Sequence, residues 1–151
     1  NPDLLLADEP TTALDVTIQA QVMDLIKELQ DKYQTAMLLI THDMGVVAQV
    51  CDSVAVIYAG NILEYGTKEQ IFDHPSHPYT IGLFNSIPSM SEDEEWLHPI
   101  DGLPTGCPFS PRCSYATEEC KKGHIQMSLT ADGHQCRCCR LDEIKQEGNK
   151  E

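Results

Sequence analysis

The alternation of apolar and polar stretches divides the first fifty residues into predicted strands and helices. Leu4 to Asp8 begins as an apolar run without alternation, which predicts a strand buried on both faces of a sheet. A second apolar run, Met37 to Thr41, predicts another short strand. A helix is predicted between them, because apolar residues recur at steps of three and four, at Ile18, Val22, Leu25, Leu29 and Tyr33.

This order of strand, helix and strand predicts parallel strands and an α/β fold. Asp15 precedes the helical pattern, where its carboxylate can accept hydrogen bonds from the first turn. A short helix is predicted after the second strand, from Val46, Val47 and Val50. The segment "SVAVIYAGNILEYG" predicts two strands around a turn at Gly60-Asn61, and Pro78 to Ile87 predicts a short amphipathic helix.

Polar side chains follow both apolar strands at the point where each strand ends. Asp8 and Glu9 close the first strand, and His42 follows the second. Ligands of parallel sheets bind at the carboxyl ends of strands, so these side chains are expected at one edge. There a carboxylate can hold Mg²⁺, a second can activate a water, and a histidine can contact a phosphoryl group. The alternative is that the carboxylates only begin a turn and His42 caps a helix.

Three segments in this order, "LLLADEP", "ALD" and "LLITHD", resemble the ATP-binding subunits of ABC transporters over residues 1–66. The resemblance implies the C-terminal part of a P-loop ATPase domain that acts on ATP and Mg²⁺. It implies that Asp8 helps to bind Mg²⁺, that Glu9 is the general base for the attacking water, and that His42 contacts the γ-phosphate. "ALD", Ala13 to Asp15, corresponds to the loop that reaches the ATP site of a partner subunit.

The chain departs from this family by what it lacks. It contains no G-x-x-x-x-G-K-[ST] phosphate loop, no glutamine loop and no LSGGQ signature, and it begins with Asn rather than Met. We therefore expect a C-terminal fragment of a longer protein. We expect no ATPase activity from the fragment alone, since hydrolysis requires two complete domains face to face.

The segment "HPSHPYTIGLFNSIP" resembles the extension found in the oligopeptide/dipeptide branch of ABC importers, which nickel importers share. The resemblance implies a second ATPase subunit, membrane permease subunits and a solute-binding protein as partners. It also implies a peripheral location on the cytoplasmic face of the membrane. His74 and His77 are expected to be loop residues beside prolines rather than metal ligands. The sequence does not choose among dipeptides, longer peptides and nickel.

Charge and cysteine content change near Gly106. Residues 1–106 hold 17 acidic and 3 basic residues, whereas residues 107–151 hold 7 of each. The acidic part argues against nucleic acid as a partner, and hence against a DNA-repair or translation ATPase. No apolar run reaches the roughly 18 residues of a transmembrane helix, and no signal peptide is recognisable.

Six of the seven cysteines follow residue 106, and clustered cysteines without a secretion signal favour metal over disulfides. Their spacing resembles the motif that holds a [4Fe–4S] cluster in some subunits of this branch, which implies as ligands Cys107, Cys113, Cys120 and Cys138, with Cys136 or Cys139 as substitutes for the last. Zinc, with His124 or His134 as further ligands, and free or disulfide-linked cysteines are the alternatives. Neighbouring cationic side chains are expected to lower the thiol pKa values: Arg112, Lys121, Lys122, Arg137 and Arg140.

The predicted organisation has three parts: an ATPase part over 1–66, an extension and linker over 67–106, and an irregular Cys-rich segment over 107–151. The Cys-rich segment has few periodic apolar positions, so we expect it to need a metal or a similar staple. The predicted function is an ATP-hydrolysing subunit that energises peptide import. The alternative is a regulatory or redox module in which a metal cluster sits on an ATPase scaffold.

Overall fold

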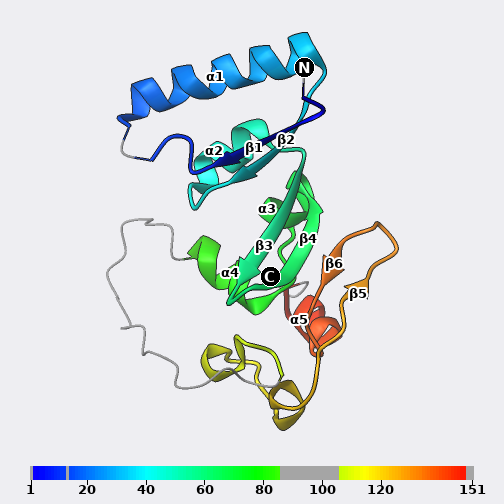
Figure 1. Ribbon diagram of the computed structural model, residues 1–151. Helices are drawn as coiled ribbons and strands as arrows, with labels where there is room; N and C mark the ends of the chain where they lie inside the picture. The colour runs from blue at the N-terminus through cyan, green and yellow to red at the C-terminus, as the bar shows by residue number, and fades with distance from the viewer. Residues whose placement is uncertain (1, 13, 86–105, 149–151) are drawn as a thin grey trace. The chain divides into compact units, whose positions relative to one another are not determined.

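The computed structural model describes residues 2–12, 14–85 and 106–148 (Figure 1). These residues divide into two compact units, Asn1–Asp52 and Ser53–Glu151. The predicted charged linker "SMSEDEEW", residues 89–96, lies outside the described residues. The predicted domain boundaries at residues 66 and 106 stay predictions.

The first unit has the predicted order of strand, helix and strand. Its elements are β1 (Leu4–Asp8), α1 (Val16–Tyr33), β2 (Ala36–Ile40) and α2 (Met44–Val50). The two strands are parallel, with Asp8 opposite Ile40. Asp15 caps α1 as predicted, because its carboxylate accepts hydrogen bonds from the amides of Thr17 and Ile18, each at 3.0 Å.

The prediction that β1 is buried on both faces is wrong for this chain. Leu4 is 51% exposed and Leu6 is 65% exposed, whereas Ala7 is buried. Burial on both faces requires a layer of helices packed against each face of the sheet, and the two-stranded sheet of this unit is not covered to that extent within the described residues. A run of leucines predicts the burial of a strand within a complete domain. The described part of this unit provides less burial than that.

The second unit begins with an antiparallel pair, β3 (Ser53–Tyr58) and β4 (Asn61–Thr67). The turn between them lies one residue earlier than predicted. Ala59 and Gly60 are its central residues, and both have positive φ values, 46° and 72°. A tight hairpin with two left-handed residues matches the right-handed twist of the strands, and Asn61 is therefore the first residue of β4.

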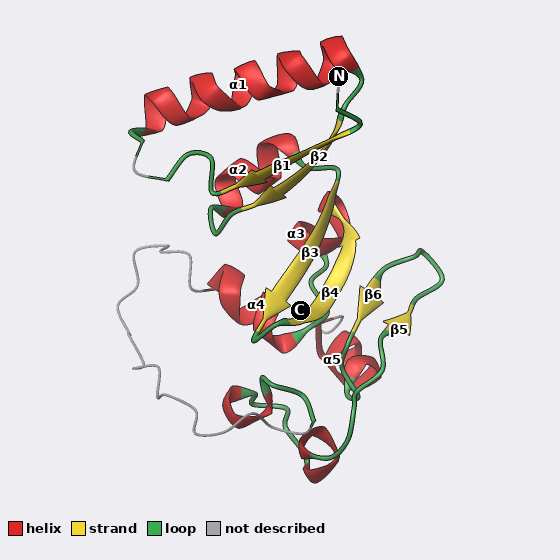
Figure 2. Cartoon of the chain, in the orientation of Figure 1, coloured by secondary structure: helices red, strands yellow, loops and turns green. Residues whose placement is uncertain are grey.

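Two helices and the Cys-rich segment complete this unit (Figure 2). The helices are α3 (Lys68–Asp73) and α4 (Pro78–Asn85), so the predicted helix from Pro78 is present as far as the described residues reach. The regular elements of the Cys-rich segment are short, except for the last: two 3₁₀ turns at Ser110–Arg112 and Glu118–Lys121, β5 (Ser128–Leu129), β6 (Gln135–Cys136) and α5 (Leu141–Gly148).

The strand β6 joins the Cys-rich segment to the sheet. It pairs antiparallel with β4, which gives the strand order β3-β4-β6-β5. Leu63 of β4 forms a buried cluster with Cys107, Phe109 and Cys120. Cys107 and Cys120 are thus part of the hydrophobic core of this unit.

The fold class is therefore mixed α/β, with one parallel and one antiparallel sheet. None of the helices in the described part of the chain combines the length and the apolar character needed to cross a membrane.

Candidate functional site

The ends of β1 and β2 bring Glu9 and His42 into direct contact. The backbone amide of Glu9 donates to the carbonyl of Ile40 at 2.8 Å, which extends the ladder by one residue. Glu9 then turns out of the strand with a φ of 43°. This turn places its carboxylate Oε1 3.0 Å from Nδ1 of His42. Two residues 33 positions apart in the sequence thus meet at one edge of the sheet, as their positions after parallel strands predicted.

The carboxylate of Glu9 is held on its other side by Thr12. The Thr12 hydroxyl donates to Oε2 of Glu9 at 2.7 Å. This hydrogen bond, and next the one with His42, lowers the pKa of Glu9 below its ordinary value. The side chains of Glu9 and His42 are 44% and 79% exposed. The site is therefore an ionised carboxylate beside an imidazole, open to a ligand from solution.

The start of α2 is capped by Asp43 and not by His42. Asp43 Oδ1 accepts from the amides of Gly45 and Val46 at 2.8 and 3.2 Å. Its Oδ2 accepts from the Gln19 side chain of α1 at 2.7 Å, and this bond is the first cause that lowers the pKa of Asp43. The alternative in which His42 is a helix cap is therefore wrong, and His42 is left to contact Glu9.

The remaining predicted residues of this site are separate from that contact. Asp8 is the last residue of β1 and is exposed. Asp15 uses its carboxylate to cap α1. Ala13, the first residue of "ALD", lies outside the described residues. Sequence reasoning missed the roles of Thr12, Gln19 and Asp43. The position of Asp43 directly before a helical pattern was an available signal for its role as a helix cap.

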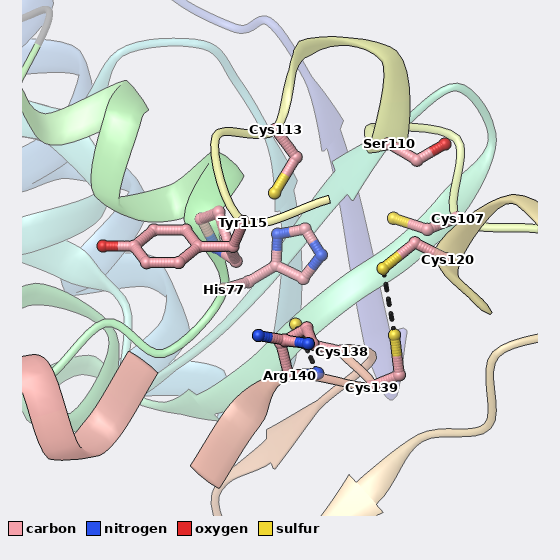
Figure 3. Close-up of a pocket in the computed structure, with 10 residues that line it drawn as sticks. His77, Cys107, Ser110, Cys113, Tyr115, Cys120, Cys138, Cys139 and Arg140 are labelled. Atoms are coloured by element: carbon pink, nitrogen blue, oxygen red, sulfur yellow. Dashed lines mark hydrogen bonds between the residues drawn. The ribbon is translucent and has the colours of Figure 1, made fainter. Parts of the chain in front are cut away.

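A second candidate site lies in the other unit, where the four predicted cysteines line one pocket (Figure 3). Cys107 and Cys113 flank the first 3₁₀ turn, Cys120 lies in the second, and Cys138 follows β6. The amide of Cys107 donates to the carbonyl of Cys120 at 2.8 Å, which holds these loops together. Cys139 lines the same pocket, with its sulfur 3.1 Å from that of Cys120.

The thiol pKa values differ from the sequence prediction. Burial raises the pKa of Cys107 and Cys113, and it raises that of Cys138 to about 11. Cys120 alone of these four has a lowered pKa: burial opposes the shift, but hydrogen bonds from the amide and hydroxyl of Thr117 outweigh it. Desolvation of the thiolates therefore exceeds the effect of the neighbouring cations.

The geometry disfavours a single metal ion at this pocket. No group of three or more His, Cys, Asp and Glu side chains in the described residues is arranged to hold an ion. Four thiolates around one Zn²⁺, at about 2.3 Å from it, would lie about 3.8 Å from one another. The zinc alternative therefore has no support from the structure, and no disulfide bond joins the cysteines of the described residues.

A buried carboxylate connects the pocket to the sheet. Glu64 of β4 is fully buried, and its Oε1 accepts from the amide of Ser76 at 2.6 Å and from Nε2 of His134 at 2.7 Å. Its Oε2 accepts from the amide of His77 at 3.0 Å. One side chain thus joins β4, the loop before α4 and the segment that leads into β6. Sequence reasoning missed this role of Glu64, and it left His77 as an ordinary loop residue.

A protein-family model matches part of the second unit. The family model described as "Oligopeptide/dipeptide transporter, C-terminal region" matches residues 63–120. This match covers β4, the loop with Glu64's partners, α4 and the first three predicted cysteine ligands.

Curated relatives match nearly the whole chain. An oligopeptide transport ATP-binding protein of Haemophilus influenzae is 55% identical, over 95% of this chain and 46% of its own length. A dipeptide transport ATP-binding protein of Bacillus subtilis is 48% identical, over 94% of this chain and 44% of its own length. An oligopeptide transport ATP-binding protein of Escherichia coli is 52% identical over 79% of this chain. The chain spans a little under half the length of these relatives.

Proposed function

The chain belongs to the ATP-binding proteins of oligopeptide/dipeptide transport, and from this premise we propose that it forms part of an ATP-hydrolysing subunit that energises peptide import. The hydrogen bond between Glu9 and His42 is the observation that supports hydrolysis most directly. The relatives are about twice as long, so we expect the phosphate-binding loop and the signature segment in the rest of the full-length protein. The exposed leucines of β1 agree with this view, because the layers packed on the sheet of a complete domain would cover them.

In this proposal Glu9 accepts the proton of the attacking water. The lowered pKa keeps its carboxylate ionised at neutral pH, as a base requires. Asp8, one residue earlier at the strand end, helps to hold the Mg²⁺ of Mg-ATP. His42 contacts the γ-phosphate and orients Glu9 through the bond at Nδ1. Asp15 belongs to the loop that faces the partner subunit, and its bonds to α1 hold that loop in place.

The test is the replacement of Glu9 by Gln in the full-length protein within its assembled transporter. Removal of a general base lowers ATP turnover by about 100-fold or more. Glu28→Gln is the matched control, because it removes the same charge from an exposed position on α1. Turnover that stays at the wild-type rate in Glu9→Gln overturns the assignment.

We also propose that Cys107, Cys113, Cys120 and Cys138 hold a [4Fe–4S] cluster, as their spacing implies. The four thiols line one pocket, and thiolates are the ligands that such clusters take. Two buried polar atoms without a partner among the described residues, Nε2 of His77 and Oγ of Ser110, belong to residues that line the same pocket. When bound, such a cluster staples the loops and supplies one-electron redox chemistry. Bonds between iron and the cysteine thiolates would offset the free-energy cost of deprotonating thiols whose pKa values are raised by burial.

Anaerobic purification of the full-length protein, with iron and sulfide analysis and an absorption spectrum, tests this cluster. Near-stoichiometric iron and sulfide that are lost in Cys113→Ser support it. Ser114→Ala, at an exposed neighbour of Cys113, is the control, because Cys51 is partly buried and its replacement could disturb the fold. Zinc, or no metal, in the wild-type protein contradicts it.

The partners and location follow from the same proposal. A second ATPase subunit completes two composite ATP sites, permease subunits bind the pair at the cytoplasmic face of the membrane, and a solute-binding protein delivers the peptide. Relatives named for oligopeptide and for dipeptide transport both match, and these names favour peptide over nickel as the substrate.

The alternative function is a regulatory or redox module on an ATPase scaffold. Transport that persists after loss of the cluster would contradict the redox alternative.

A further inference from the structure

His77 has a tautomer that the structure fixes. The amide of Tyr79 donates to Nδ1 of His77 at 3.0 Å, so Nδ1 is the acceptor nitrogen of the ring. Burial lowers the pKa of His77 to about 4, against a smaller opposite effect of the Arg137 backbone carbonyl. A neutral ring that accepts at Nδ1 carries its proton at Nε2.

This Nε2–H group is buried and has no hydrogen-bond partner among the described residues. His77 is 1% exposed, and its Nε2 atom is buried. Figure 3 shows the ring in the pocket among the cysteine side chains. A buried donor without an acceptor destabilises the folded state, so its presence in a core calls for an acceptor in the pocket.

Ser110, in another element, also has a buried polar atom without a hydrogen-bond partner among the described residues. Its side chain lines the same pocket and is 4% exposed, and its Oγ also lacks a partner within the described part of the chain. Ser110 begins the 3₁₀ turn between Cys107 and Cys113. Two residues with a buried polar atom that lacks a partner, one from the loop before α4 and one from the Cys-rich segment, therefore line the pocket of the thiols.

We propose that His77 and Ser110 donate hydrogen bonds to the sulfur atoms of the group held by the four cysteines. This inference rests on the proposed cluster. Cluster sulfurs are anionic acceptors, and donors to them stabilise the reduced, more negative state and raise the reduction potential. Glu64 positions the first donor, because its carboxylate fixes the His77 amide. The segment "HPSHPYT" is thereby a part of the cluster site, with His77 as a neighbour of the sulfurs and not as a metal ligand.

The experiment measures the midpoint potential of the anaerobically purified full-length protein together with its iron and sulfide content. His77→Phe keeps a planar ring without a donor and lowers the potential at unchanged iron content. His77→Gln, whose amide nitrogen can reach the place of Nε2, restores much of the shift. His74→Gln is the matched control and leaves the potential unchanged, because His74 is exposed outside the pocket.

Ser110→Ala removes a single oxygen and provides a second test where His77→Phe fails to fold. It lowers the potential, and it removes one exchangeable proton coupling to the reduced cluster in electron–nuclear double resonance. Full cluster content with wild-type potential and unchanged proton couplings in both variants overturns the inference alone. A wild-type protein without iron and sulfide overturns the proposed cluster, and the inference with it.

Discussion

Replacement of Glu64 tests how the loop before α4 is held against the sheet. Glu64→Ala removes the acceptor of three groups, the amides of Ser76 and His77 and Nε2 of His134. Each buried donor without a partner costs about 1–3 kcal/mol, and breaking a buried pair costs about 3–5 kcal/mol. We therefore expect a local destabilisation of about 3–6 kcal/mol. Glu64→Gln keeps one acceptor oxygen but turns an NH₂ group toward a donor, so about 1–3 kcal/mol is expected.

Hydrogen exchange at individual amides measures this loss where it occurs. The Ser76 and His77 amides should exchange faster, by about tenfold for every 1.4 kcal/mol of lost local stability. Glu28→Gln, on the exposed face of α1, controls for the change of charge. Protection of both amides that stays within about twofold of wild type in Glu64→Ala would refute the reasoning, because the amides would then not depend on the carboxylate.

Three further changes have defined outcomes. Thr12→Val removes the first cause of the lowered Glu9 pKa, so the acid limb of the ATP turnover profile of the full-length protein should move to higher pH. Asp43→Ala removes the cap of α2 and should cost about 1 kcal/mol at pH 7. Because the folded-state pKa of Asp43 is lowered, its charge-dependent stabilisation is present above its unfolded pKa of about 3.9 and is lost as pH falls through the folded value, so variant and wild type should converge in acid-unfolding experiments. Gly106→Ala places a Cβ against the carbonyl of Cys120, which should cost about 1–3 kcal/mol and increase exchange at the Cys107 amide; equal exchange would contradict the close approach.

The contact between Glu9 and His42 was within reach of the sequence. Two apolar runs joined by a helix predict parallel strands, and parallel strands end at one edge. The support from Thr12 was out of reach, because it depends on the left-handed turn at Glu9, a conformation that a non-glycine residue seldom adopts. The burial of β1 was mispredicted, because an apolar run reports the environment of a complete sheet.

The cysteine pocket was predicted in part. The spacing of Cys107, Cys113 and Cys120 brought them into consideration, and they line one pocket with Cys138 and Cys139. The resemblance favoured Cys138 as the fourth ligand with Cys139 as a substitute, and both of these adjacent residues line the pocket.

The contact between Glu64 and the loop before α4 could not be predicted from the sequence. Leu63 and Glu64 alternate along β4 as apolar and polar residues do on a half-exposed strand, yet both are fully buried. The burial of Glu64 depends on hydrogen-bond donors from residues 12 and 70 positions away. His77 then enters the core because its amide is fixed by that carboxylate.

The fate of ATP bound to the full-length Glu9→Gln variant tests the central claim most directly. The wild-type subunit should convert bound ATP to ADP in a single turnover. The variant should bind Mg-ATP with unchanged affinity and retain it as ATP, since the water lacks its base while the binding groups remain. Conversion to ADP at the wild-type rate would contradict the role of Glu9, and so would a variant that no longer binds ATP.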